Sequence, residues 1–175
     1  GGLRRSRHRD PVILSGRQIA RAIARREIEI HPFDAREMNP NSYNYRLGTE
    51  IVDIGSGEVK QIGGEGLILR AGRFYLGHTA EQIGSIKYTP LLIGRSSIGR
   101  LGLFVQVDAD LGQIGAVHGW TLELRPTKDI TVYGGIHIGQ VSFWETRGRR
   151  TIYRGPYAEF DTPIGNVQDL SLIHI

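Results

Sequence analysis

Trp120-Thr121-Leu122-Glu123-Leu124 is the stretch of sequence that best indicates the fold. Its large apolar residues alternate with polar ones, as they do when successive side chains of a β-strand point to opposite faces of a sheet. Similar short apolar runs recur from Tyr43 onward, separated by glycines. The runs span residues 51–54, 67–69, 74–76, 91–93, 103–105, 130–132 and 136–143. Many short strands at regular spacing predict an all-β sandwich, jelly roll or barrel.

One helix is predicted before these strands, over residues 15–26. Ser15 is a good N-cap, and Gln18 three residues later completes a capping box. Ile19 and Ile23 lie four residues apart on one face, and the arginines of this segment are displaced from that face. The 175 residues therefore suit one mainly β domain with an N-terminal helix, large enough to bury a core without disulfides.

The composition excludes several classes of protein. The chain has no cysteine, so it forms neither a disulfide nor a thiolate metal site. Zinc-dependent base deaminases hold their metal with cysteines, so a deaminase built from this chain has to activate water without zinc. No apolar run approaches the roughly 20 residues that span a bilayer. The apolar run after the basic start is too short for a signal peptide, and the expected location is the cytoplasm.

Most of the excess positive charge lies at the start of the chain. The net charge is +4, and residues 1–10 hold four arginines and one aspartate. A basic arm of this kind can bind nucleic acid. We favour the alternative, a disordered leader over residues 1–11, and do not expect nucleic acid as a partner. Residues 166–175 are expected to form a C-terminal tail.

The segment 94–102 joins two apolar runs and contains Arg95, Ser96, Ser97 and Arg100. Ser96 and Arg100 are four residues apart, so one helical turn places them on the same face. Hydroxyls, backbone N–H groups and guanidinium groups are the groups that hold phosphates. Taken alone, however, this pattern more often marks a solvated connection between strands.

Glu123 stands in the middle of a predicted strand, where glutamate is disfavoured. Enclosure between Leu122 and Leu124 would suit it to act as a general base, because burial raises the pKa of a carboxyl group. The alternative is a solvent-facing glutamate that pairs with Arg125 or with a cation on a neighbouring strand. The alternation alone favours this alternative.

The loop 107–119 contains Asp108, Asp110 and His118. An Asp-x-Asp pair by itself is a poor signal for a cation site. The six histidines of the chain show no spacing typical of metal ligands. His118 and His137 are therefore interpreted as structural, and the residues predict no metal site of the protein itself.

In order and spacing, these segments resemble the dCTP deaminase family of the dUTPase superfamily over residues 12–165. The segments that carry the resemblance are 13–15, 32–34, 41–48, 95–102, 120–124 and 135–140. The resemblance implies a jelly-roll-like β fold and a homotrimer with active sites between subunits. It implies hydrolysis of the 4-amino group of dCTP, or of a related cytidine nucleotide, to give dUTP and ammonia. It also implies Mg²⁺ bound through the triphosphate and no zinc.

The resemblance also implies catalytic roles for matching residues. Glu123 matches the glutamate that takes a proton from the attacking water and passes it to the pyrimidine ring. Ser96 and the backbone of Ala109 match the groups that hold this water. Arg100 matches the arginine that orients the carboxylate and the base.

A second group of residues is implied to bind the nucleotide. Arg95 and Ser97 match positions that contact the triphosphate. Gln113 stands at a position that contacts the sugar. Tyr153 and Tyr157 belong to a segment that resembles a Tyr-x-Gly-Lys-Tyr pattern.

The chain departs from the family pattern at five positions. Gln113 replaces an aspartate that also activates water in the dUTP-hydrolysing relatives, and a glutamine amide does not accept a proton near neutral pH. Ala116 replaces an aromatic residue, His118 a glycine, Pro156 a lysine and Asn44 an aspartate.

Two alternative functions stay open. One is a bifunctional dCTP deaminase and dUTP diphosphatase, against which Gln113 argues. The other is a regulatory protein that binds a nucleotide without turnover.

Overall fold

The computed structural model describes residues 12–106 and 108–154. Its helical elements are α1 (Gly16–Ala24), the 3₁₀ turn η1 (Ala35–Glu37) and α2 (Ser96–Arg100). Its strands are β1 (Ile28–His31), β2 (Tyr43–Arg46), β3 (Glu50–Asp53), β4 (Glu58–Gln61), β5 (Leu67–Leu69), β6 (Tyr75–Ser85), β7 (Thr89–Gly94), β8 (Leu103–Val105), β9 (Val117–Pro126), β10 (Ile130–Val132) and β11 (His137–Trp144). The predicted mainly β fold with one main helix is confirmed. The predicted arm (1–11) and tail (166–175) lie outside the described residues, so the domain limits stay predictions.

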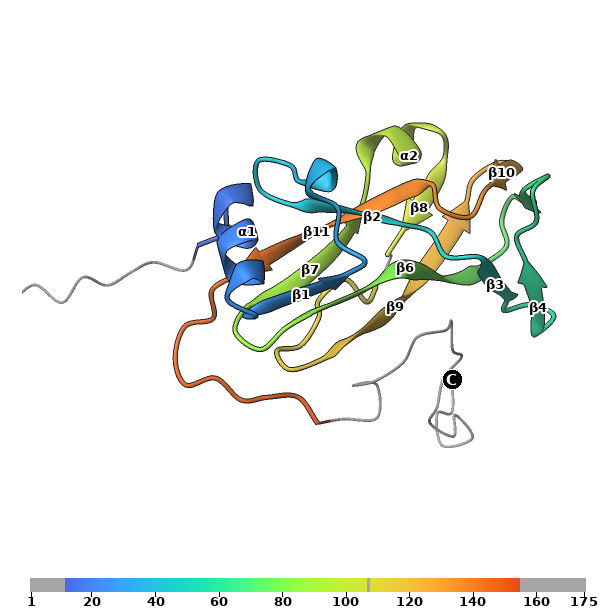
Figure 1. The fold of residues 1–175 in the computed structure, drawn as a ribbon. Coiled ribbons are helices and arrows are strands. Elements are labelled where there is room, and N and C mark those ends of the chain that lie inside the picture. The colour runs from blue at the N-terminus through green and yellow to red at the C-terminus, as the bar shows by residue number, and fades with distance from the viewer. Residues whose placement is uncertain (1–11, 107, 155–175) are drawn as a thin grey trace, which may run out of the picture.

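The strands pair antiparallel in three sheets. The largest has the order β4-β3-β6-β9-β8, with β1 also paired to β6, and the others are β2-β11-β7 and β10-β5. Figure 1 shows the β2-β11-β7 sheet lying across the sheet that contains β6 and β9, with α2 at the end of β7. Two facing sheets of this kind are the architecture that the alternating strands predicted.

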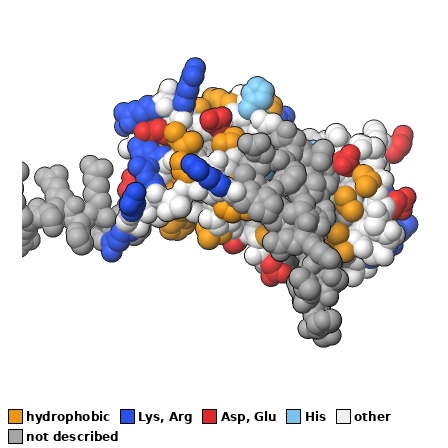
Figure 2. Space-filling view, turned by 90° about the horizontal axis from the view of Figure 1, so that it is seen from below, with side chains coloured by type: hydrophobic (Ala, Val, Ile, Leu, Met, Phe, Trp, Pro, Cys, Tyr) orange, Lys and Arg blue, Asp and Glu red, His pale blue; other side chains and the backbone are white. Residues whose placement is uncertain are grey.

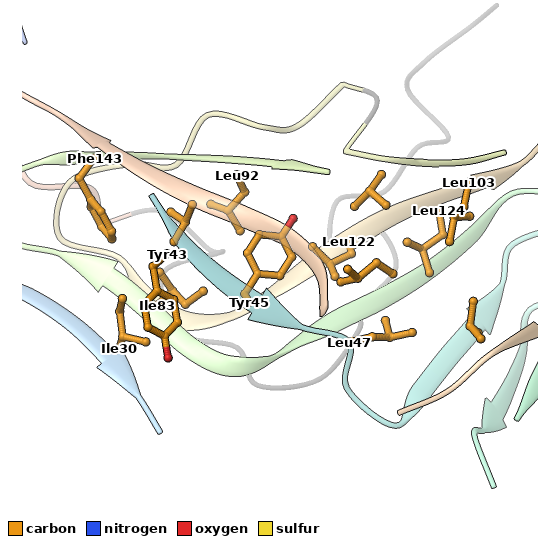
Figure 3. Close-up of a cluster of buried hydrophobic side chains, with 14 of the residues drawn as sticks. Ile30, Tyr43, Tyr45, Leu47, Ile83, Leu92, Leu103, Leu122, Leu124 and Phe143 are labelled. Carbon is orange, nitrogen blue, oxygen red and sulfur yellow. The ribbon is translucent and has the colours of Figure 1, made fainter. Parts of the chain in front are cut away.

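The core lies between these two sheets (Figure 3). Tyr45 and Phe143 come from one sheet and Ile83 and Leu122 from the other, and all four are completely buried. The hydroxyl of Tyr45 donates a hydrogen bond to the carbonyl of Ile93 at 3.0 Å. Burial holds the pKa of the Tyr45 hydroxyl far above its usual value, so the group stays protonated and keeps donating.

Helix α1 begins where it was predicted and ends two residues earlier. Ser15 is its N-cap, with the hydroxyl oxygen accepting from the N–H of Gln18. The helix stops after Ala24 because Arg26 takes a left-handed backbone conformation, with φ of +57°. Its outward side carries exposed arginines, and Figure 2 shows Lys and Arg side chains gathered at the end of the molecule where α1 lies. Among the described residues, no helix is both long and apolar enough to cross a membrane.

Several strands differ from the prediction: β1 and β2 were not among the predicted runs, and β6 and β4 differ for identifiable reasons. Strand β6 runs over eleven residues, whereas only its start was predicted, because Gly77 and Gly84 suggested breaks. Both glycines instead allow close approach to neighbouring strands: a Cβ at Gly84 would collide with the carbonyl oxygen of Ala116 on the β9 side. Strand β4 was missed because it is an exposed edge strand without an apolar run.

Candidate active site

Helix α2 is a single helical turn that contains both Ser96 and Arg100, whereas the sequence pattern alone favoured a solvated connection. Arg95 precedes it with an extended backbone, and its carbonyl accepts hydrogen bonds from the N–H groups of Ile98 (3.0 Å) and Gly99 (2.9 Å). The chain then turns at Gly102, where φ is +90°, and enters β8. Figure 1 shows α2 above β8. The serines and arginines of this turn therefore lie next to β8, the strand that pairs with β9.

The four predicted side chains of this segment are accessible. Ser96, Ser97 and Arg100 are exposed, and Arg95 is half-buried. Within residues 12–106 and 108–154, none of these side chains forms a hydrogen bond or an ion pair. Two guanidinium groups and two hydroxyls are therefore available to an anionic ligand such as a phosphate.

Strand β9 presents Glu123 as the alternation predicted. Leu122 and Leu124 lie in the core and are fully buried (Figure 3), whereas Glu123 is half-buried on the opposite face. The predicted enclosure between the two leucines is therefore wrong, because neighbours along a strand point away from each other. The predicted alternative of an ion pair with Arg125 is not formed either. The carboxylate Oε2 of Glu123 instead accepts a hydrogen bond from the N–H of Asp108 at 2.6 Å.

The loop after β8 lies against this carboxylate. The backbone N–H of Gln106 donates to the carbonyl of Glu123 at 3.0 Å. The side chain of Gln106 accepts from the N–H of Glu123 and donates to the carbonyl of Ala109, both at 2.8 Å. The structure thus brings together Ala109 and Glu123, two of the four predicted catalytic groups. Sequence reasoning missed Gln106, because a single glutamine after an apolar run carries no recognisable signal.

Ser96 and Arg100 are not bonded to Glu123 within the described part of the chain. They are connected to it through the main chain, since α2 leads into β8 and β8 pairs with β9 in the register Val105 to Leu124. In a single chain the predicted catalytic residues therefore lie on adjoining elements without a shared hydrogen-bond network.

Two further predicted nucleotide-binding residues, Gln113 and Tyr153, lie on separate segments that meet. Gln113 is exposed, and its side chain has no hydrogen-bond partner among residues 12–106 and 108–154. The N–H of Tyr153 donates to the carbonyl of Ile114 at 2.8 Å, which brings the segment after β11 next to Gln113. Tyr157 and Pro156 lie outside the described residues.

The remaining singled-out polar residues take part in local contacts. The buried ring of His118 lies against Trp120 with 4.2 Å between ring centroids. His137 Nε2 lies 2.8 Å from a carboxylate oxygen of Glu37, and Asn44 donates to the other oxygen at 3.4 Å. These contacts support the structural interpretation of both histidines. In the ranges that the structure describes, no three His, Asp or Glu side chains gather as metal ligands would.

Comparison with known proteins shows the family to which the chain belongs. A family model described as dCTP deaminase-like matches residues 13–146. The "dCTP deaminase, dUMP-forming" of Cytophaga hutchinsonii is 40% identical over 153 residues, covering 82% of this chain and 88% of the relative. The protein of the same name from Clostridium beijerinckii is 41% identical over 152 residues, covering 81% and 87%.

A solved structure shares the fold. The 2'-deoxycytidine 5'-triphosphate deaminase of Agrobacterium tumefaciens superposes with a TM-score of 0.66 at 20% identity. The match covers 79% of this chain and 49% of that one, so this chain spans about half the length of the solved protein.

Proposed function

The chain belongs to the dCTP deaminase-like family, and on that premise we propose that it hydrolyses the 4-amino group of dCTP and releases ammonia. The observation that carries the proposal is the held carboxylate of Glu123. One of its oxygens is fixed by the N–H of Asp108, and the carbonyl of Ala109 is tied to the same strand through Gln106. The other carboxylate oxygen has no partner among the described residues and is free to take a proton from water.

The proposed reaction needs no metal-bound water. Water attacks C4 of the cytosine ring while Glu123 removes one of its protons. Glu123 passes this proton to the ring nitrogen N3. It then takes the second proton from the hydroxyl now bound to C4 and gives it to the leaving amine, so that C4–NH₂, N3 and water become C4=O, N3–H and ammonia. Ser96 and the carbonyl of Ala109 hold the water, and Arg100 orients the carboxylate and the base. Because the chain has no cysteine, we propose a zinc-independent mechanism.

The triphosphate is assigned to the segment around α2. The guanidinium of Arg95, which has no partner in the described part of the chain, and the exposed hydroxyl of Ser97 are groups of the kind that bind phosphate oxygens. We propose that Mg²⁺ arrives on the triphosphate. Asp108 and Asp110 lie near this segment in sequence, but among the described residues they are not joined by a third ligand in a protein cage. The donor set therefore fits a metal that the nucleotide carries.

We also propose a homotrimer whose subunits complete the site. In one chain, Ser96, Ser97 and Arg100 are open to solvent, whereas a general base works best in a closed pocket. Four large apolar side chains on and around the same elements are 39–57% exposed: Ile93, Leu101, Phe104 and Leu111. Exposed apolar groups of this kind mark interaction surfaces. Light scattering is expected to give three times the chain mass, and a stable monomer at micromolar concentration would contradict the trimer.

The product is either dUTP or dUMP, and different observations favour each. Gln113 favours dUTP, because its exposed amide cannot act as the base for attack on a phosphate. The names of the two relatives, both dUMP-forming, favour dUMP. If dUMP forms, the half-buried carboxylate of Asp110 would have to act as the base that activates water for attack on the phosphate. Chromatography of the products separates the two, and Asp110→Asn is expected to stop pyrophosphate release only if dUMP forms.

The decisive test is Glu123→Gln, assayed by ammonia release from dCTP. The substitution keeps the shape but removes the proton acceptor, so the rate is expected to fall about 100- to 10,000-fold. Binding of dCTP, measured by calorimetry, is expected to persist because Glu123 is not assigned to the triphosphate. Glu58→Gln is the matched control, since Glu58 is exposed on the edge strand β4.

Two outcomes would contradict the proposal. If Glu123→Gln deaminates at nearly the wild-type rate, Glu123 is not the base. If the wild-type chain binds dCTP tightly and releases no ammonia from any cytidine nucleotide, the regulatory alternative is correct.

A further inference from the structure

The β8–β9 ladder ends in an unusual way beside Glu123. Val105 pairs with Leu124, so the next pair along the ladder is Gln106 with Glu123. Of the two backbone hydrogen bonds that such a pair can exchange, one forms: the N–H of Gln106 donates to the carbonyl of Glu123 at 3.0 Å. The other is replaced: the N–H of Glu123 donates not to the backbone of Gln106 but to its side-chain Oε1, at 2.8 Å. A side chain thus stands where the ladder would offer a carbonyl.

The other end of the same amide reaches the loop. Nε2 of Gln106 donates to the carbonyl of Ala109 at 2.8 Å. Between them, the N–H of Asp108 donates to the carboxylate of Glu123 at 2.6 Å. These bonds close a ring that runs from the backbone of Glu123 through Gln106 to the loop and back to the Glu123 carboxylate. One glutamine side chain therefore connects the Ala109 carbonyl to the strand that carries the carboxylate.

The backbone conformation of Gln106 is one that residues with a Cβ rarely adopt. Its φ is +56°, in the left-handed region that glycine adopts freely and that residues with a Cβ avoid. Among the described residues, Arg26 is the only other non-glycine residue with a positive φ. A glycine would meet the backbone requirement without strain but would lack the amide. A strained residue beside reactive groups is a feature that points to function.

We propose that Gln106 is a positioning residue for the reaction: it holds the Glu123 carboxylate and the Ala109 carbonyl at the spacing that receives the attacking water. This proposal rests on the proposed deamination. It predicts that activity and stability respond differently to substitution of Gln106. The side chain supports the geometry of the site, whereas the left-handed backbone conformation lowers the stability of the fold.

Two substitutions at this position test the proposal. Gln106→Gly removes the amide and relieves the left-handed backbone. Gln106→Met keeps the length and removes both hydrogen bonds. For both, kcat for ammonia release is expected to fall roughly 10- to 100-fold, as for other displacements of catalytic groups, with KM for dCTP changed by less than about threefold. The Tm of Gln106→Gly is expected to equal or exceed that of wild type. Gln18→Met, on the exposed side of α1, is the matched control.

Amide exchange measured by NMR provides a readout that does not depend on turnover. The N–H groups of Asp108 and Glu123 are expected to be protected in wild type, and that of Asp108 to lose protection in Gln106→Gly while core amides keep theirs. Unchanged kcat, or a Tm that falls in parallel with kcat in Gln106→Gly, would overturn the proposal. If wild type releases no ammonia, the proposed function fails by itself. Persistent protection of Asp108 in Gln106→Gly would then also overturn the positioning role.

Discussion

Two arginines beside the sheets, Arg46 and Arg73 (the framework arginines), have carboxylate partners, whereas Arg95 and Arg100 around α2 have none within residues 12–106 and 108–154. Arg46 Nε lies 2.7 Å from Oε1 of Glu81, which is completely buried. Arg73 Nη2 lies 2.9 Å from Oδ2 of Asp53, which is 1% exposed. In both pairs the carboxylate is inside the protein and the guanidinium closes it off from the surface.

The comparison shows two different uses of the same side chain. A buried carboxylate needs a partner, because an uncompensated charge is very unfavourable away from water. Among the described residues, Arg95 and Arg100 face no such carboxylate, so their charges are available to an anionic ligand. The framework arginines are therefore expected to matter for stability and the α2 arginines for activity.

The largest effect on stability is expected for Arg46→Met. The substitution keeps an apolar stem but leaves the Glu81 carboxylate buried with only the N–H of residue 46 as a donor from this strand. Removing one partner of a buried pair costs about 3–5 kcal/mol, which corresponds to a fall in Tm of roughly 6–20 °C for a chain of this size. Thermal unfolding followed by circular dichroism measures the change.

A matched control separates this pair from ordinary surface charge. Arg70→Met removes a pair with Asp129 in which both side chains are more than half exposed. Its Tm is expected to change far less than that of Arg46→Met. Equal changes in Tm in the two variants would show that burial of the Glu81 carboxylate does not make the Arg46–Glu81 pair more important for stability than an exposed pair.

A smaller effect, on activity alone, is expected for Arg100→Met. Arg100 is exposed and has no partner in the described structure, so its removal leaves no orphaned charge and the Tm is expected to stay within error. A lost hydrogen bond to a charged group is worth about 1.5–3 kcal/mol, so kcat/KM for dCTP is expected to fall roughly 10- to 100-fold. A drop in Tm comparable to that of Arg46→Met would contradict the distinction between the two regions.

The smallest effect is expected for an exposed pair that belongs to neither region. The guanidinium of Arg36 donates to the carboxylate of Asp34 and lowers the pKa of that carboxyl from 3.8 to about 2. Because the folded-state pKa is the lower one, the stabilisation is complete well above pH 3.8 and is lost as the pH falls toward 2. The urea midpoints of wild type and Asp34→Asn are expected to differ slightly at pH 6 and to converge below pH 4. A difference that grows on acidification would contradict this sign.

Much of the fold and part of the site followed from local patterns. The alternation around Glu123 predicted which side of β9 faces the core. The spacing of Ser96 and Arg100 was compatible with the turn α2, although the pattern alone favoured a solvated connection. Strand β6 was predicted only in part, because Gly77 and Gly84 suggest turns when no neighbouring strand is known. Gln106 was not predicted, because its role depends on Ala109 and Glu123, whose positions relative to it are set by pairing between strands.

The sequence by itself determined the class of fold and the residue types that carry chemistry, since both depend on periodicity and on local motifs. The tertiary structure decided which of these residues have partners. The contact of Arg46 with Glu81 joins residues 35 positions apart, and the N–H of Asp108 reaches a carboxylate 15 positions away. Contacts of this kind arise from the register of paired strands, and no local pattern encodes that register. For this reason the alternation placed Glu123 on the face of the strand away from the core, but only the folded chain shows that its carboxylate is held by the loop after β8 and not by Arg125.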